Sequence, residues 1–245
     1  MKQGFFQIAE NIPLTDSVMR MRLTGDVSDI TAPGQFINIK LDGLYLRRPI
    51  SVYDKDDTSV TIIYKVVGKG TEQMRQMKQG ETLDVLTGLG NGYDLSVSGE
   101  KPLLLGGGVG VPPLYMLAKR LIAEGRQVSV ILGFNTKQEI FCEEEFRALG
   151  ADVTVTTADG SYGVKGFVTD AMKNTDYTYF YTCGPEPMLK AIYRTCQTEG
   201  QFSFEERMGC GFGACMGCSC KTITGYKRIC KDGPVMRKEE ILWEA

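Results

Sequence analysis

The chain has 245 residues, of which 42% are hydrophobic and 24% charged, a composition typical of globular proteins with one large or two moderate cores. Its net charge of -2 and its pI near 5.4 give no electrostatic reason to expect a nucleic acid or an anionic membrane as partner. Histidine is absent, which excludes His-based catalytic triads, His metal ligands and His-ligated haem.

The first hundred residues alternate apolar and polar side chains in short runs, which is the pattern of half-buried β-strands. The runs lie at 18–23, 36–41 and 60–64, and clusters of Gly and Asp separate them. Several short strands at this spacing predict a small antiparallel barrel. We assign residues 1–98 to it.

From residue 101 on, short apolar runs alternate with segments of helical periodicity. Strands are predicted at 103–105, 128–134, 153–157 and 177–181, and helices at 114–123, 143–149 and 187–199. This alternation indicates a parallel sheet with right-handed crossovers, and we assign it to residues 99–201. Residues 202–245 are rich in Gly and Cys and cannot bury a core of their own, so we expect a small third domain there.

Two adjacent arginines, Arg47 and Arg48, lie in a predicted strand just before Pro49, Ile50 and Ser51. The rigid fork of donors on arginine suits a phosphate, and a serine hydroxyl can bond a flavin ring atom. A solvated pair of charges is the alternative explanation for the arginines.

A glycine-rich loop at 106–113 joins the first strand of the second domain to the helix that follows. Bare backbone at Gly107, Gly108 and Gly110 lets a pyrophosphate approach closely, and the start of the helix offers unpaired N–H groups. The pattern departs from G-x-G-x-x-G because Pro113 stands at the last glycine position, and it does not separate NAD from NADP. A tight structural turn is the alternative.

The segment Cys183-Gly184-Pro185 follows the last predicted strand of this domain directly. Ligands of open α/β sheets bind at the carboxyl ends of the strands, so Cys183 is placed to line a nicotinamide pocket. A buried thiol before a turn is the alternative.

Five of the eight cysteines crowd into one segment near the end of the sequence. The spacing Cys210-x4-Cys215-x2-Cys218 followed by Cys230 is that of plant-type [2Fe–2S] ferredoxins. The glycines between them would let the loop turn its amides toward the sulfur atoms. Four thiolates can also hold a structural zinc ion. Spacing alone leaves open whether Cys218 or Cys220 is the third ligand.

The order of these features resembles the ferredoxin–NADP reductase superfamily, in which an Arg-x-Tyr-Ser or Arg-x-Tyr-Thr segment binds FAD. Residues 48–51 take those places, with Ile50 instead of the aromatic residue. The closer resemblance is to the family of electron-transfer subunits of type B dihydroorotate dehydrogenases. It covers nearly the whole chain and rests on segments 47–51, 68–71 and 106–113 and on the cysteines with 230–235.

This resemblance implies an N-terminal antiparallel FAD-binding β-barrel, a parallel-sheet nucleotide-binding domain and a small C-terminal [2Fe–2S] domain. The implied FAD contacts are Arg48, Pro49, Ile50, Ser51, Ile63, Tyr64, Lys65, Gly70 and Thr71. The implied cluster ligands are Cys210, Cys215, Cys218 and Cys230, which makes Cys220 a bystander. The implied NAD contacts are Gly107, Gly108, Gly110, Cys183, Gly184 and Pro185.

The resemblance also implies electron transfer without catalytic acid–base residues. The partner would be an FMN-containing catalytic subunit that oxidises dihydroorotate to orotate in pyrimidine biosynthesis, in an α2β2 assembly. Electrons would pass through the cluster and FAD to NAD. One alternative is an NAD(P)H diaphorase subunit of a hydrogenase or of a ferredoxin-dependent transhydrogenase, and another is a zinc-stabilised binding module. No apolar signal segment opens the sequence, and no uncharged run reaches the ~20 residues of a membrane helix, so we expect a cytoplasmic protein.

Overall fold

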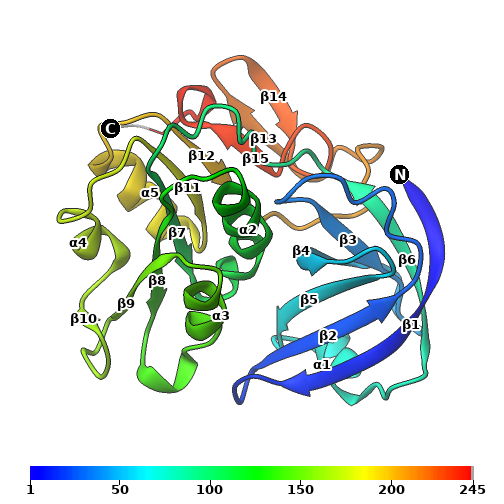
Figure 1. Ribbon diagram of the computed structural model, residues 1–245. Coiled ribbons are helices and arrows are strands. Elements are labelled where there is room, and N and C mark those ends of the chain that lie inside the picture. Colours follow the sequence, from blue (N-terminus) through cyan, green and yellow to red (C-terminus); the bar gives the residue numbers. More distant parts are fainter. Residues whose placement is uncertain (244–245) are drawn as a thin grey trace.

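The structure is a computed structural model that describes residues 1–243. Figure 1 shows a β-barrel beside an α/β unit, with the C-terminal strands, orange to red, across the top of the junction between them. None of the helices in the described residues is long and apolar enough to cross a membrane. The predicted combination of a barrel and a parallel-sheet domain is confirmed.

The barrel is closed by six antiparallel strands in the order β1-β2-β5-β4-β3-β6. These strands are β1 (Lys2–Pro13), β2 (Val18–Thr24), β3 (Phe36–Ile39), β4 (Arg48–Lys55), β5 (Ser59–Lys65) and β6 (Thr82–Leu89), and helix α1 (Lys69–Gln76) follows β5. Successive side chains of β5 point to opposite faces of the sheet. Ile62 and Tyr64 belong to the core inside the barrel, whereas Ile63 belongs to the core shared with the α/β unit. The barrel therefore presents the outer face of β5 to the second domain.

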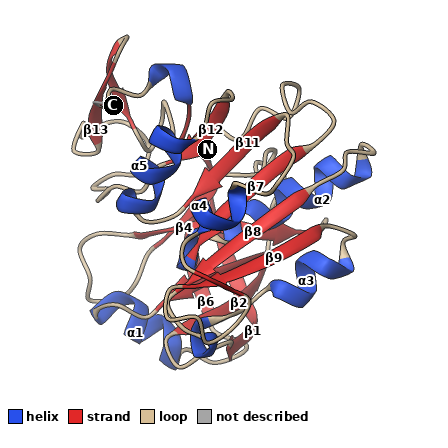
Figure 2. Ribbon diagram, turned by 90° about the vertical axis from the view of Figure 1, so that its left-hand side faces the viewer, coloured by secondary structure: helices blue, strands red, loops and turns tan. Residues whose placement is uncertain are grey.

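The second domain is a seven-stranded sheet in the order β10-β9-β8-β7-β11-β12-β15, parallel except for β15. Its strands are β7 (Pro102–Gly107), β8 (Ser129–Phe134), β9 (Asp152–Thr157), β10 (Val164–Lys165), β11 (Tyr179–Cys183), β12 (Gly200–Ser203) and β15 (Val235–Arg237). Helices α2 (Tyr115–Ala123) and α3 (Glu143–Ala148) cover one face, and α4 (Val168–Met172) and α5 (Glu186–Thr195) cover the other (Figure 2). Both faces are buried, which explains the uninterrupted apolar runs of the strands.

Two predicted elements differ in extent from the observed ones. The helix expected at 187–199 ends at Thr195, because Cys196 is already extended and the chain must return to start β12 at Gly200. The strand expected at 177–181 is β11, whose pairing with β7 carries it on to Cys183. The expected loop at 106–113 contains two short 3-10 turns, Gly108–Gly110 and Pro112–Leu114.

The C-terminal segment is partly built into the sheet. The expected boundary between residues 201 and 202 falls within β12, and β15 pairs antiparallel with β12. Between these two strands lie a loop with the cysteines and a hairpin of β13 (Ser219–Thr222) and β14 (Gly225–Arg228). The division of the chain into three domains stays a prediction.

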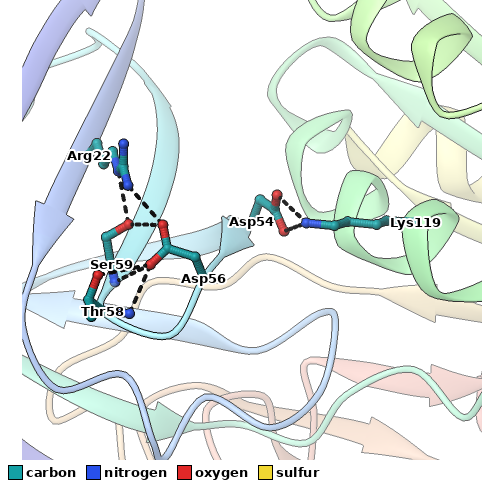
Figure 3. Close-up of polar contacts among 6 residues, drawn as sticks. All are labelled: Arg22, Asp54, Asp56, Thr58, Ser59 and Lys119. Carbon is teal, nitrogen blue, oxygen red and sulfur yellow. Dashed lines mark hydrogen bonds and ion pairs between the residues drawn. The ribbon is translucent and has the colours of Figure 1, made fainter.

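Strand β4 and helix α2 hold the two units together. The rings of Tyr53 and Tyr115 stack with centroids 4.3 Å apart, and Lys119 reaches from α2 to Asp54 at 2.8 Å (Figure 3). Lys119 is half exposed, so its ion pair contributes less than about 1 kcal/mol, and the buried aromatic contact stabilises the junction more.

Candidate functional site

The two adjacent arginines have different partners. Arg47 binds Asp84 of β6 with its guanidinium group: Nη2 lies 3.0 Å from both carboxylate oxygens, and Nη1 lies 3.0 Å from the main-chain oxygen. Arg48 forms no ion pair with any residue in the described range, and its Nη1 donates to the carbonyl of Leu46 at 2.5 Å. Arg47 therefore stabilises the barrel, and Arg48 is the one available for an anion.

Helix α1 begins beside Arg48. A Cβ atom at Gly70 would lie 2.2 Å from Arg48 Nε, so only glycine allows this close approach. The hydroxyl of Thr71 accepts hydrogen bonds from the N–H groups of Val67, at 2.9 Å, and Gly68, at 3.2 Å, and thereby fixes the turn before the helix. The positive end of the helix dipole and a guanidinium group thus lie together, an arrangement suited to a phosphate.

The remaining predicted barrel residues lie on β4 and β5. Pro49, Ile50 and Ser51 are half-buried. The Tyr64 side chain points into the barrel, where its hydroxyl donates to Asn11 Oδ1 at 3.1 Å, so it can offer a ligand outside the barrel only its main chain. Lys65, at the end of β5, is exposed.

A small cleft joins the barrel to the glycine loop. Its lining includes Lys65 from β5, Gly108 and Val109 from the loop, and Phe134 from the end of β8. A second cavity of about 460 Å³ lies at the opposite end of the sheet, next to Lys101, and contains none of the predicted site residues. The smaller cleft is the relevant one because residues predicted for two different cofactors meet there.

The glycine loop and the Cys-Gly-Pro segment lie against each other at the carboxyl ends of β7 and β11. The parallel register places Cys183 opposite Gly106. A Cβ atom at Gly110 would lie 2.3 Å from the Cys183 carbonyl oxygen, and one at Gly184 would lie 3.2 Å from Gly107 N. Bare backbone therefore forms this edge of the sheet, where open α/β sheets bind their ligands.

Cys183 is a neutral thiol in this setting. Burial raises the pKa of Cys183 to about 12. A neutral thiol is a poor nucleophile, so Cys183 fits a role in shaping a pocket and not in covalent chemistry.

Backbone amides point at the sulfur atoms of the cysteine segment. Cys210 Sγ accepts from the N–H groups of Ala214 at 3.2 Å and Cys215 at 3.4 Å. Cys218 Sγ accepts from the N–H of Cys230 at 3.4 Å, and Cys215 Sγ accepts from the N–H of Gly217 at 3.5 Å. Such donors stabilise negatively charged sulfur, as ligands of a metal cluster require.

The pKa values of two cysteines reflect these surroundings. Burial acts to raise the pKa of Cys210, but amide donors, that of Cys215 foremost, outweigh it and lower the pKa to about 6. Burial and the hydrogen-bonded thiol of Cys218 raise the pKa of Cys230 to about 12. Near neutral pH Cys210 is therefore mostly a thiolate, whereas Cys230 would lose its proton only on binding a metal.

The four cysteines form two pairs, each joined by a hydrogen bond from main chain to sulfur. The N–H of Cys215 donates to Cys210 Sγ, and the N–H of Cys230 donates to Cys218 Sγ. Within residues 1–243, no three Cys, Asp or Glu side chains converge as ligands of one metal ion must. Two pairs of cysteines fit a two-iron cluster, which is held by four cysteine thiolates. Cys220 belongs to neither pair and lies on β13 opposite Lys227 of β14.

Sequence reasoning missed two amide side chains that hold the cysteine segment. Asn91, after β6, donates its Nδ2 to the Val235 carbonyl at 2.8 Å and accepts from the Val235 N–H at 3.0 Å. Asn38, on β3, donates its Nδ2 to the Cys210 carbonyl at 3.3 Å. No motif marks either residue, because Asn38 reads as an ordinary polar position in the alternating run at 36–41.

Two protein families match segments of the chain. The iron-sulfur cluster binding domain of dihydroorotate dehydrogenase B matches residues 205–242. The oxidoreductase NAD-binding domain matches residues 104–194. These segments contain the cysteine pairs and the glycine-lined sheet edge, respectively.

Full-length relatives carry one name. The chain is 44% identical to the dihydroorotate dehydrogenase B (NAD(+)), electron transfer subunit, of Bacillus pumilus, over 98% of each chain. It is 45% identical to the protein of the same name from Fusobacterium nucleatum, over 96% of each. Of the solved structures, an NADH-dependent reduced ferredoxin-NADP oxidoreductase gives a TM-score of 0.88 at 32% identity, over 98% of this chain and 90% of that one. A ferredoxin NADP+ reductase from Neisseria gonorrhoeae gives a TM-score of 0.70 at 19% identity, over 80% and 90%, a likeness of fold.

Proposed function

We infer that this chain, which belongs to the family of electron transfer subunits of dihydroorotate dehydrogenase B (NAD(+)), carries electrons between a catalytic subunit and NAD through FAD and a [2Fe–2S] cluster. The observation that carries this function lies in the segment that matches the family's cluster-binding domain. There, main-chain N–H groups donate hydrogen bonds to the sulfur atoms of two pairs of cysteines. We further propose that the catalytic partner contains FMN and oxidises dihydroorotate to orotate, and that the two subunits form an α2β2 assembly.

The FAD site lies on the outer face of β4 and at the start of α1. Arg48 and the N–H groups around Gly70 would hold the diphosphate, because the Arg48 guanidinium group lies beside the N-terminus of α1. Pro49 and Ser51 would line the flavin with their side chains. Ile50 and Tyr64, whose side chains pack inside the barrel, would contribute main chain only. FAD, when bound, exchanges two electrons as hydride with a nicotinamide and single electrons with a cluster.

The NAD site lies along the carboxyl ends of β7 and β11. Gly107, Gly108 and Gly110 would bring bare backbone to the dinucleotide, and the segment 183–185 would face the nicotinamide. The cleft shared by Lys65 and Gly108 supports an arrangement in which the nicotinamide meets the flavin between the two units. Cys183 would fill this pocket as an uncharged side chain.

The cluster ligands would be Cys210 with Cys215 and Cys218 with Cys230. Their amide donors fit negatively charged sulfur, whereas Cys220 lies outside both pairs. Because ligand thiolates must stay reduced, we propose that the protein is cytoplasmic.

Two other functions are less well supported. The alternative of a ferredoxin-dependent transhydrogenase subunit rests on one solved structure that is 32% identical to this chain. The dihydroorotate dehydrogenase B proteins are 44–45% identical to it. A zinc-stabilised binding module is less well supported because the family that matches residues 205–242 is an iron-sulfur cluster binding domain.

The test is anaerobic purification, with measurement of FAD, iron and sulfide, followed by titration with NADH. Flavin and cluster absorption that NADH bleaches would support the proposal, and a colourless protein with stoichiometric zinc would refute it. The variant Cys215→Ala should keep NADH reduction of FAD and lose electron transfer to the partner. Normal flow to the partner in a cluster-free variant would contradict the assigned route.

A further inference from the structure

Asn38 is the one polar residue of strand β3, and its direct neighbours on β4 and β6 are apolar. Asn38 is 1% exposed and lies opposite Pro49 of β4 and Leu86 of β6. Directly paired residues share a face, and Leu86 belongs to the same apolar core as Cys218 and Cys230. An amide has therefore been placed in the apolar layer between the barrel and the cysteine segment.

The Asn38 amide bonds the main chain of a cysteine proposed as a cluster ligand. Its Nδ2 donates to the Cys210 carbonyl oxygen at 3.3 Å. The next residue, Gly211, has φ +80, and a Cβ atom there would lie 2.3 Å from Asn38 Nδ2. The loop thus passes so close to β3 that only glycine fits. Because Nδ2 faces a carbonyl, the reversed amide would bring two oxygen atoms together, so the orientation is determined.

The other end of the same amide has no partner. Asn38 Oδ1 is buried and accepts no hydrogen bond from any residue in the described range. A buried acceptor without a donor is destabilising. An apolar side chain of similar shape would remove this acceptor, which offsets the loss of the hydrogen bond to Cys210. Leucine would suit the neighbours Pro49 and Leu86 better than asparagine does. The stability of the barrel therefore gives no reason for an amide at this position, whereas the contact with Cys210 does.

We propose that Asn38 is a positioning residue, whose amide holds the Cys210 main chain against the flavin-binding strand and thereby sets the reduction potential of the cluster and the rate of its reduction by the flavin. The inference rests on the proposed function. Asn38 lies directly between the two sites, because its β4 partner Pro49 is a proposed flavin contact. The positive end of the Asn38 N–H dipole points at the Cys210 peptide. It therefore stabilises the reduced state, in which the cluster and its ligands carry an additional electron.

The test compares Asn38→Leu with Gln35→Leu in the complete, loaded protein. Gln35 is a matched control: it is also a buried amide of the barrel, 7% exposed, but its Oε1 accepts from the N–H groups of Thr31 and Ala32 and it does not bond the cysteine segment. The measurements are FAD and iron content, thermal unfolding, a redox titration of the cluster followed by electron paramagnetic resonance, and stopped-flow reduction by NADH.

Asn38→Leu should unfold at the same temperature as the wild type or at a higher one. Its cluster potential should be lower, and its cluster reduction about fivefold slower, as expected for one lost hydrogen bond, with hydride transfer to FAD unchanged. Gln35→Leu should be less stable with an unchanged potential. A wild-type potential, spectrum and rate of cluster reduction in Asn38→Leu would overturn the inference.

A second variant, Asn38→Asp, tests the inference if Asn38→Leu does not bind the cluster. Asn38→Asp keeps the shape but turns an oxygen toward the Cys210 carbonyl, so it should lower the potential further, and a wild-type potential in this variant would overturn the inference. Wild-type protein without iron would refute the proposed function and the inference together. Loaded wild-type protein with unchanged Asn38 variants would refute the inference alone.

Discussion

Replacing Gly110 with alanine perturbs the contact between the glycine loop and the Cys-Gly-Pro segment. The new Cβ atom would lie 2.3 Å from the Cys183 carbonyl oxygen and 2.5 Å from its carbon. Carbon atoms in contact normally stay about 3.5 Å or more apart, so the two segments must separate by about 1 Å. Both partners are main chain, and no side chain can rotate to relieve the clash.

The expected loss of stability is about 1–3 kcal/mol, the usual range for overpacking a tight contact. The expected loss in kcat/KM for NADH reduction of FAD is about 10- to 100-fold, because a displacement of about 1 Å at a positioned reactant can cost a factor of about 100. FAD and iron content should be unchanged, since neither proposed site includes this contact.

The assay is stopped-flow reduction of the flavin at varied NADH concentration, together with thermal unfolding. Gly125→Ala serves as a control, because it has φ +82 with no atom within 4 Å of the added Cβ and lies at the far end of α2. It should lose about 1–2 kcal/mol through the left-handed conformation without any change in NADH kinetics. If Gly110→Ala bound and oxidised NADH like the wild type, the sheet edge would not be the dinucleotide site.

Three further predictions concern single side chains. Cys220→Ser should keep full iron and sulfide content, and a loss of iron would contradict the assignment of the four ligands. Arg47→Ala should lower the unfolding free energy by about 1–3 kcal/mol, because it leaves the mostly buried carboxylate of Asp84 without its ion-pair partner. Arg48→Ala should unfold like the wild type but retain less FAD on gel filtration. The reverse pattern would contradict the different roles of the two arginines. Hydrogen bonds, led by the N–H of Thr58, hold the pKa of Asp56 well below its usual range (Figure 3). The folded-state pKa is lowered, so the stabilisation is complete above the unfolded-state value of about 4 and is lost as the pH falls below it. The difference in Tm between the wild type and Asp56→Asn should therefore be constant from about pH 7 to pH 5 and shrink below about pH 4, and a difference that does not depend on pH would refute this.

The sequence was most informative where local pattern and burial agree. The run Leu103-Leu104-Leu105 predicts a strand that is buried on both faces, and β7 is completely buried. The cysteine spacing predicts a shared site, and the loop does fold its amides toward the sulfur atoms. In both cases the information lies within a few residues of the chain, where a pattern can be read without knowledge of the fold.

Contacts between distant segments were not predictable. Arg47 and Arg48 are neighbours of the same type, and only the barrel places Asp84 beside the first of them. Asn38 meets Cys210 across 172 positions of sequence. Cys220 stands two residues from Cys218, and only the β13–β14 pairing shows that it lies in a strand opposite Lys227. Such contacts follow from strand register, which a single sequence does not reveal.

The position of β15 has a consequence for how the protein is made. This strand pairs with β12, and it follows Cys230, the last of the four proposed cluster ligands, in the chain. Until the loop between β12 and β15 has folded, β12 presents a row of unpaired backbone groups to other chains. Supply of iron and sulfide would then act as a folding aid, and starvation for either would show itself first as aggregated protein.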